Sequence, residues 1–88
     1  MSTVIGRHKV GDFNTWLKGH QERVDAFAPA VSGFKTFQDT DDPNSIAIVF
    51  EVTDMEKFQS IFADPNIKEL KNKHTVLDPI TISMPVDI

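Results

Sequence analysis

The stretch from Arg7 to Val24 constrains the fold of this chain more than any other, because it joins a strand pattern directly to a helix pattern. Residues 3–10 alternate in the way that predicts a strand, with one face formed by Val4, Gly6, His8 and Val10. Gly11 breaks the alternation, and the Asp12 carboxylate is placed to cap the free N–H groups of a following turn. We therefore expect a helix that begins at Phe13.

The expected first helix has one apolar stripe. Residues at spacings of three and four fall on this stripe: Phe13, Trp16, Leu17, His20, Val24 and Phe27. Arg23 flanks the stripe and could meet an anionic ligand or the partner chain, but an exposed salt bridge is the role that we favour for it. Gly19 weakens a helix by about 1 kcal/mol relative to alanine, a cost accepted most readily where another group must approach closely. Pro29 and Gly33 mark the end of the helix.

The middle of the chain predicts a hairpin of two strands. Residues 32–39 alternate as an edge strand, and the turn formers at 40–44 follow them. Residues 45–52 are apolar on both faces, which is typical of a strand that is covered on both sides and lies centrally in a sheet.

The last third predicts a broken helix and a final strand. Thr53 and Glu56 have the spacing of a capping box, with Asp54 as an alternative cap. The sequence Asp64-Pro65 is a second start signal, so the helix should break near Ala63 and resume to about residue 73. Inward positions are expected at Phe58, Ile61, Phe62, Ile67, Leu70 and His74. After Asp78-Pro79, the alternation of residues 80–86 predicts the last strand.

This order of elements, β-α-β-β-α-β, predicts a single α+β domain over residues 1–88 with the ferredoxin-like fold. Its four-stranded antiparallel sheet would have the first and third strands in the centre and helices on one face. The other face would still carry apolar side chains, and 88 residues leave the chain short of core. The simplest solution is a homodimer in which two sheets pack face to face.

Composition excludes several classes of function. The chain has no cysteine, which excludes disulfides, thiolate nucleophiles and cysteine-based metal sites. A net charge of −4 without a basic face argues against nucleic acid as a partner. No apolar run approaches membrane-spanning length and no signal-peptide layout is present, so no membrane association is expected and a cytoplasmic location is the default expectation. The four glycines are too dispersed for a phosphate-binding loop or a dinucleotide fingerprint.

Several motifs give the sequence a family resemblance. The strand residues 7–10 (RHKV), the helix start Gly11-Asp12-Phe13-x-x-Trp16, the turn 41–44 (DDPN) and the strand end Phe50-Glu51 resemble the dimeric α/β-barrel proteins related to antibiotic-biosynthesis monooxygenases. The resemblance covers nearly the whole chain and implies a homodimeric α/β barrel with a pocket between helices and sheet. Haem-degrading members of this superfamily carry a tryptophan on or near the second helix. The only tryptophan here is Trp16 in the first, and we predict no cofactor.

The best candidates for catalytic residues are His8, His20 and His74, because imidazole changes charge near neutral pH and can move a proton or polarise a substrate oxygen. The alternative for each is a buried polar residue that bonds to the backbone. No HxxxH spacing supports a metal site, and none is predicted. Aromatic side chains are the candidates for holding a ligand ring, with a core role as the alternative: Trp16, Phe50 and Phe62.

These observations give one leading functional hypothesis and two alternatives. The leading one is a small homodimer that binds a compact apolar or aromatic molecule in the helix–sheet pocket and oxidises it without an organic cofactor. The second is a non-catalytic ligand-binding or stress-related protein with the same pocket. The third is a structural dimer whose pocket is collapsed.

Overall fold

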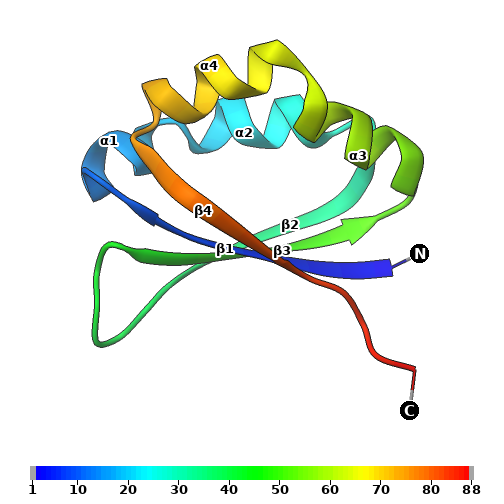
Figure 1. Cartoon of the computed structure of the whole chain (residues 1–88), viewed down its shortest axis with the longest axis horizontal. Helices are drawn as coiled ribbons and strands as arrows, with labels where there is room; N and C mark the ends of the chain where they lie inside the picture. Colours follow the sequence, from blue (N-terminus) through cyan, green and yellow to red (C-terminus); the bar gives the residue numbers. More distant parts are fainter. Residues whose placement is uncertain (1, 88) are drawn as a thin grey trace.

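The computed structural model describes residues 2–87 and consists of two layers, with four helical segments on one face of a curved sheet (Figure 1). The elements follow in the order β1 (Ser2–Val10), α1 (Phe13–Lys18), α2 (His20–Phe27), β2 (Val31–Gln38), β3 (Ser45–Val52), α3 (Met55–Ala63), α4 (Pro65–Lys73) and β4 (Val76–Ser83). The sheet has four strands in the order β2-β3-β1-β4, and all neighbours are antiparallel. The predicted ferredoxin-like α+β fold is therefore confirmed, with β1 and β3 central.

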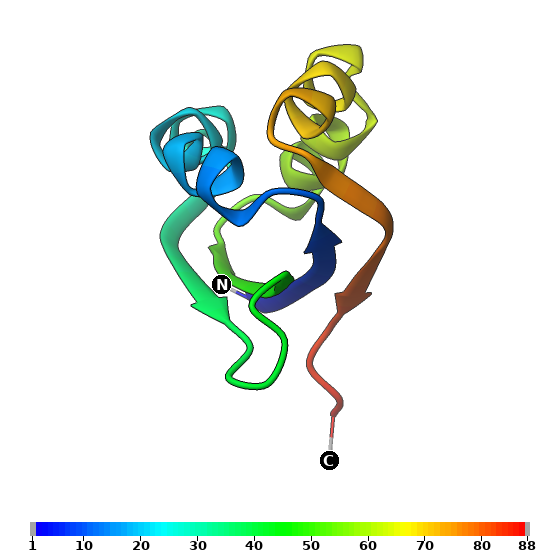
Figure 2. The ribbon, with the colours of Figure 1, turned by 90° about the vertical axis from the view of Figure 1, so that its left-hand side faces the viewer.

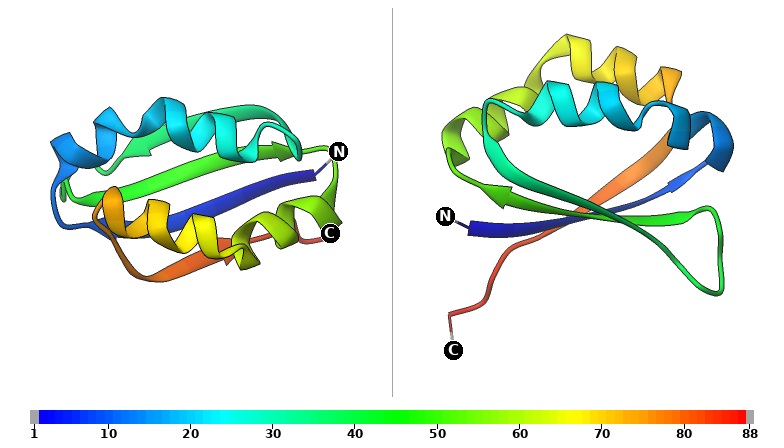
Figure 3. Two further views of the ribbon diagram at one scale, coloured as in Figure 1. Left: turned by 90° about the horizontal axis from the view of Figure 1, so that it is seen from above. Right: turned by 180° about the vertical axis from the view of Figure 1, so that it is seen from behind.

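The helices lie along the sheet in two rows. Figure 3 shows α1 and α2 in one row and α3 and α4 in the other, and Figure 2 shows both rows on the same side of the sheet. No helix among residues 2–87 is long and apolar enough to cross a membrane.

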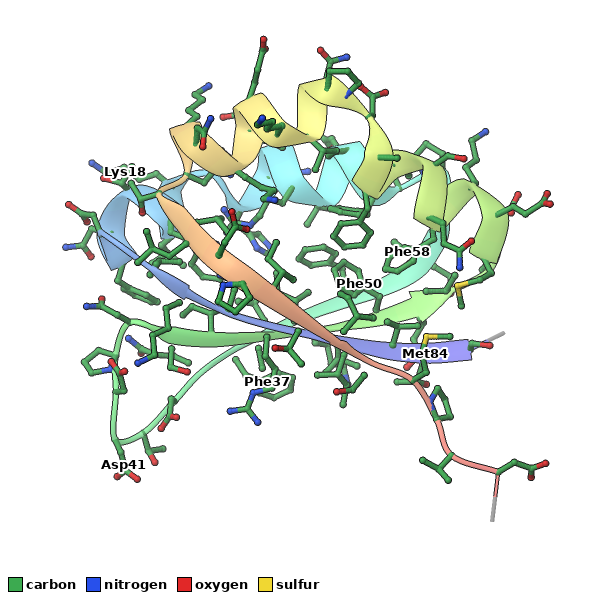
Figure 4. The ribbon with its side chains drawn as sticks, viewed as in Figure 1. Lys18, Phe37, Asp41, Phe50, Phe58 and Met84 are labelled. Carbon is green, nitrogen blue, oxygen red and sulfur yellow. The ribbon has the colours of Figure 1, made fainter. Side chains whose placement is uncertain are left out.

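The core lies between the two layers, on the sheet face that the helices cover. Val4, His8 and Val10 of β1 are buried there, as the alternation predicts, and β3 contributes Ile46, Ile48, Phe50 and Val52. Phe50 is the centre of an aromatic cluster, with ring centroids 5.1 Å from Phe27 and 5.0 Å from Phe58 (Figure 4). Offset and edge-on contacts of this kind add to the stabilisation from burial alone.

The first helical region differs from the single stripe that we predicted. The helix begins at Phe13 with Asp12 as its cap, as expected, but it breaks at Gly19 and ends at Phe27. A wheel drawn through the whole region as one helix therefore misplaces some of its side chains. Leu17 is 49% exposed, whereas Arg23 is only 6% exposed. The prediction that Arg23 forms an exposed salt bridge was wrong.

The second helical region breaks where the sequence predicts. Asp54 caps α3 by accepting from the backbone N–H of Lys57, so the alternative cap is the one used, and Asp64 caps α4. The last strand is β4 at Val76–Ser83, earlier than the predicted 80–86. Val76 and Leu77 pair with the end of β1, and Pro79 lies at a register shift, where the pairing moves from Lys9–Leu77 to Arg7–Thr81 on this edge strand.

The outward face of the sheet carries apolar side chains that nothing in the described chain covers. Ile5 is 37% exposed, Phe37 is 51% exposed and Leu77 is 48% exposed. Phe37 points away from the helices in Figure 4. The same face carries the cations Arg7, Lys9 and Lys35 next to Glu51.

Candidate functional site

A cavity of about 50 Å³ lies between the sheet and the helices α2 and α4. Its walls are mostly apolar and contain histidine and cationic side chains. They comprise Gly6, His8, Arg23, Phe27, Ile48, Phe50, Phe62, Ile67, Leu70, Lys71, His74, Val76 and Ile80. Ligand sites typically enclose roughly 300–1,000 Å³, so a ring-sized molecule has to displace side chains as it enters.

His8 presents one ring nitrogen as a free acceptor. Strand alternation places His8 on the covered face, where its Nδ1 lies 3.1 Å from the Lys9 carbonyl oxygen. A carbonyl only accepts, so Nδ1 carries the proton and Nε2 holds a lone pair. Burial lowers the pKa of His8 from its ordinary value, and the charge of Arg23 lowers it further. His8 is therefore neutral at pH 7, with an Nε2 that has no hydrogen-bond partner among residues 2–87.

His74 has a hydrogen bond on one side of its ring and faces a carboxylate on the other. Its Nδ1 accepts from Arg23 Nη1 at 3.1 Å, because a guanidinium only donates, and the proton of the neutral ring is therefore on Nε2. Nε2 lies 3.5 Å from Glu22 Oε1, which is long for a hydrogen bond. Burial and the charge of Arg23 lower the pKa of His74. Nδ1 is thus occupied by Arg23, whereas Nε2 is buried without a hydrogen-bond partner within residues 2–87, which makes His74 a positioning residue for Arg23.

Two backbone features fix the place of the His74 ring. A methyl group at Gly19 would overlap the ring, which explains why a glycine stands at the junction of α1 and α2. Thr75 has φ 59°, an unusual value for a β-branched residue. Its Oγ1 accepts from the N–H of Asp12 and donates to the Asp12 carbonyl, and these bonds hold the turn that follows His74.

Arg23 is the buried cation of the cavity wall. Its guanidinium stacks on the Trp16 ring at 3.9 Å, and its Nη1 also donates to the Trp16 carbonyl oxygen at 2.6 Å. Burial lowers the pKa of Arg23 to about 10, and Glu22 opposes this shift. Arg23 therefore stays charged at neutral pH inside an apolar wall.

The structure brings together some of the sequence-predicted site residues and separates others. Phe50, Phe62, His8 and His74 line the cavity. His20 does not; its ring packs edge-on against Phe34, with centroids 5.8 Å apart, at a separate open groove between α2 and β2. Trp16 is completely buried and lies behind the wall, where it supports Arg23. No group of three metal-ligating side chains occurs within residues 2–87.

Sequence reasoning considered an anionic ligand for Arg23 but favoured an exposed salt bridge, although a signal for burial was present. Arg23 lies seven residues after Trp16 and four before Phe27, which are both inward positions on a helix. The arginine was assigned to the flank because a charged side chain is rarely buried. The stacking partner Trp16 is what makes burial tolerable here.

We expect the histidines to make folding stability depend on pH. Both His8 and His74 have a pKa below the 6.5 of an unfolded chain, so the unfolded state binds more protons as the pH falls. The contribution of the two neutral rings to the free energy of unfolding is complete above about pH 6.5. It is lost as the pH falls towards the pKa values that the histidines have in the folded state. Thermal unfolding should show a lower Tm at pH 5.5 than at pH 7.5, with a smaller difference in His8→Gln. An unchanged Tm would contradict burial of neutral rings. The pKa values of Glu22 and Asp39 are also lowered, but these shifts change the free energy of unfolding only below about pH 4.5, which is below the pH range of this experiment.

Comparisons with known proteins agree on the architecture. No protein-family model matches the sequence, and no curated protein matches it either. Among solved structures, an antibiotic biosynthesis monooxygenase is 17% identical with a TM-score of 0.75, over 100% of this chain and 99% of that one. SnoaB, a cofactor-independent oxygenase from Streptomyces nogalater, is 16% identical with a TM-score of 0.75, over 99% and 94%. A protein from Agrobacterium tumefaciens is 14% identical with a TM-score of 0.70, over 100% and 94%.

These likenesses span the whole chain at low identity, so they concern the fold and leave the chemistry to the site. They agree with the two-layer arrangement of helices and sheet. The resemblance drawn from the sequence motifs is confirmed at this level: the chain has the ferredoxin-like α+β fold of the antibiotic-biosynthesis-monooxygenase-like proteins.

Proposed function

We propose that this protein is a homodimer that binds a compact aromatic molecule in the cavity beneath its helices and oxygenates it without a cofactor. The observation that carries the proposal is the free Nε2 of His8 at an apolar wall that includes Phe50 and Phe62. A neutral imidazole at this position is a general base. The fold shared with SnoaB, a cofactor-independent oxygenase, supports the same chemistry.

The proposed reaction uses the substrate as the reductant of oxygen. His8 Nε2 takes a proton from an acidic C–H or O–H of the substrate, and the resulting anion delivers its electrons to O₂. For an activated methylene the balance is one CH₂ group and one O₂ giving one carbonyl and one water. The charge of Arg23 favours the anion in surroundings of low dielectric constant. The phenylalanines hold the ring, and we assign no part in this step to His20.

The proposed dimer packs the outward faces of two sheets against each other. The exposed Ile5, Phe37 and Leu77 support this arrangement, because a monomer would leave them in water. A two-fold axis brings the same patch of each copy together. The predicted dimeric α/β barrel is the form that such packing would take.

The test of the proposed chemistry is the single replacement of His8 and His20 by alanine. With an aromatic substrate found by ligand screening, His8→Ala should lower kcat by about 100-fold or more, with affinity retained. His20→Ala is the matched control and should keep both. The measurement is oxygen consumption together with calorimetric binding. If His8→Ala weakens binding and the wild type shows no turnover, the non-catalytic ligand-binding protein becomes the better description.

A further inference from the structure

The charges in the cavity wall have one sign. The wall contains the cations Arg23 and Lys71 together with two histidines, and its described residues include no carboxylate. Apolar walls screen charge poorly, so the two cations give the cavity a positive potential. A ligand that carries a negative charge is favoured over a neutral one of the same shape.

Arg23 has an edge that the protein leaves without a partner. Its Nη1 is used twice, by the Trp16 carbonyl and by His74. Its Nε and Nη2 are buried and have no hydrogen-bond partner within residues 2–87. The N–H groups on these two nitrogens form one edge of the planar guanidinium, and this edge matches the two oxygens of a carboxylate.

The nearest carboxylate does not fill this edge. Glu22 accepts from Lys73 at the surface, at 3.1 and 3.2 Å, and faces His74 with its Oε1. Its charge acts on Arg23 from a distance, without a hydrogen bond. Because unpartnered buried donors are costly, the fold leaves Arg23 prepared for an anion from outside.

A route to Arg23 is present between α4 and β4. A groove there contains Lys68 and shares Phe62, Lys71 and Val76 with the cavity. Within residues 2–87, Lys71 forms one ion pair, of 3.6 Å with Asp78; the Lys71 side chain is 31% exposed and that of Asp78 is 83% exposed. A long ion pair with an exposed partner is weak, so Lys71 can move aside and widen the opening.

We infer that the ligand of this site is an aromatic carboxylate, with its ring among Phe27, Phe50 and Phe62 and its two oxygens on Nε and Nη2 of Arg23. The inference rests on the proposed pocket and adds the substrate class. His74 and Trp16 hold the guanidinium in the plane that presents this edge. The ligand enters between α4 and β4, past Lys71.

Calorimetric titration of the full chain with 2-naphthoate and with its neutral isostere 2-naphthamide tests the inference. We expect wild-type protein to bind 2-naphthoate at least about 10-fold more tightly, which is about 1.4 kcal/mol. Arg23→Lys keeps the positive charge but removes the paired N–H donors on Nε and Nη2. We expect this variant to lose most of the preference for 2-naphthoate over 2-naphthamide. Lys18→Gln removes an exposed cation of α1 and should keep the preference.

The outcomes separate this inference from the proposed function. Equal affinity for the acid and the amide would overturn the carboxylate and leave the pocket standing. A preference that survives Arg23→Lys but disappears in Lys68→Gln would place the carboxylate in the groove and overturn its assignment to Arg23. Failure of both compounds to bind would overturn the inference and remove the support for an aromatic pocket. The comparison of acid with amide uses wild-type protein, so it does not depend on the folding of any variant.

Discussion

Gly19→Ala is expected to lower the free energy of unfolding by about 2–4 kcal/mol. The usual effect of a glycine-to-alanine substitution at such a backbone position has the opposite sign. The backbone at Gly19, with φ −85° and ψ 4°, is accessible to alanine, and at such a site the change normally stabilises a protein by about 0.4–1 kcal/mol. Here the added methyl group overlaps the His74 ring. The ring would have to move, and Arg23 would lose the acceptor of its Nη1. Urea denaturation measures the difference.

The sign of this effect should reverse when His74 is shortened. In a His74→Ala background the methyl group has room, so Gly19→Ala should raise the free energy of unfolding of that variant by about 0.4–1 kcal/mol. Gly11→Ala is the control, since its nearest contact is Thr75 at an ordinary 3.6 Å, and we expect a change within about 0.5 kcal/mol. A stabilising Gly19→Ala in the wild-type background would contradict the packing of His74 at the α1–α2 junction.

Ile5→Lys is expected to convert the proposed dimer into monomers. Ile5 lies on the central strand β1 and faces outward, opposite Val49 in the register with β3. The new cation would join Arg7 and Lys35 on this face, and the two-fold axis would set it against the same charges of the second copy. A cost of about 1–3 kcal/mol for each copy raises the dimer Kd by roughly 30-fold or more. Light scattering coupled to gel filtration measures the mass.

A matched control separates assembly from folding in this experiment. Gln59→Lys adds the same charge on the exposed surface of α3, in the helix layer, and should leave the assembly unchanged. Ile5 is already 37% exposed in the single chain, so Ile5→Lys should remain folded by circular dichroism. If Ile5→Lys stays dimeric at the concentration where the wild type does, the interface lies elsewhere.

The fold followed from the sequence because its signals are local. Alternation from Val4 to Val10 and the caps at Asp12 and Asp64 each depend on a few neighbouring residues, and all three appear in the structure. The last strand was placed too late because proline at 79 suggested a strand start. The pairing of Val76 with Val10 is a contact between distant residues, and pattern alone does not reveal it.

Only part of the candidate site could be predicted from the sequence, because the site depends on which faces of the helices and the sheet meet after folding. His8 was assigned to the correct strand face by alternation, and His74 to the correct helix stripe by spacing. His20 was grouped with them because the helix was treated as continuous through Gly19. Arg23 was assigned to an exposed salt bridge because its burial depends on stacking against Trp16 and on the acceptor His74 at the end of α4, and residue spacing alone does not show that these contacts form.

Native mass spectrometry of freshly purified protein is the most direct test of a ligand-binding homodimer. One spectrum reports both the assembly and any small molecule that stays bound. We expect twice the mass of the chain at micromolar concentration, together with a defined additional mass when a bound ligand survives purification. A clean monomer at that concentration would contradict the face-to-face packing of the two sheets.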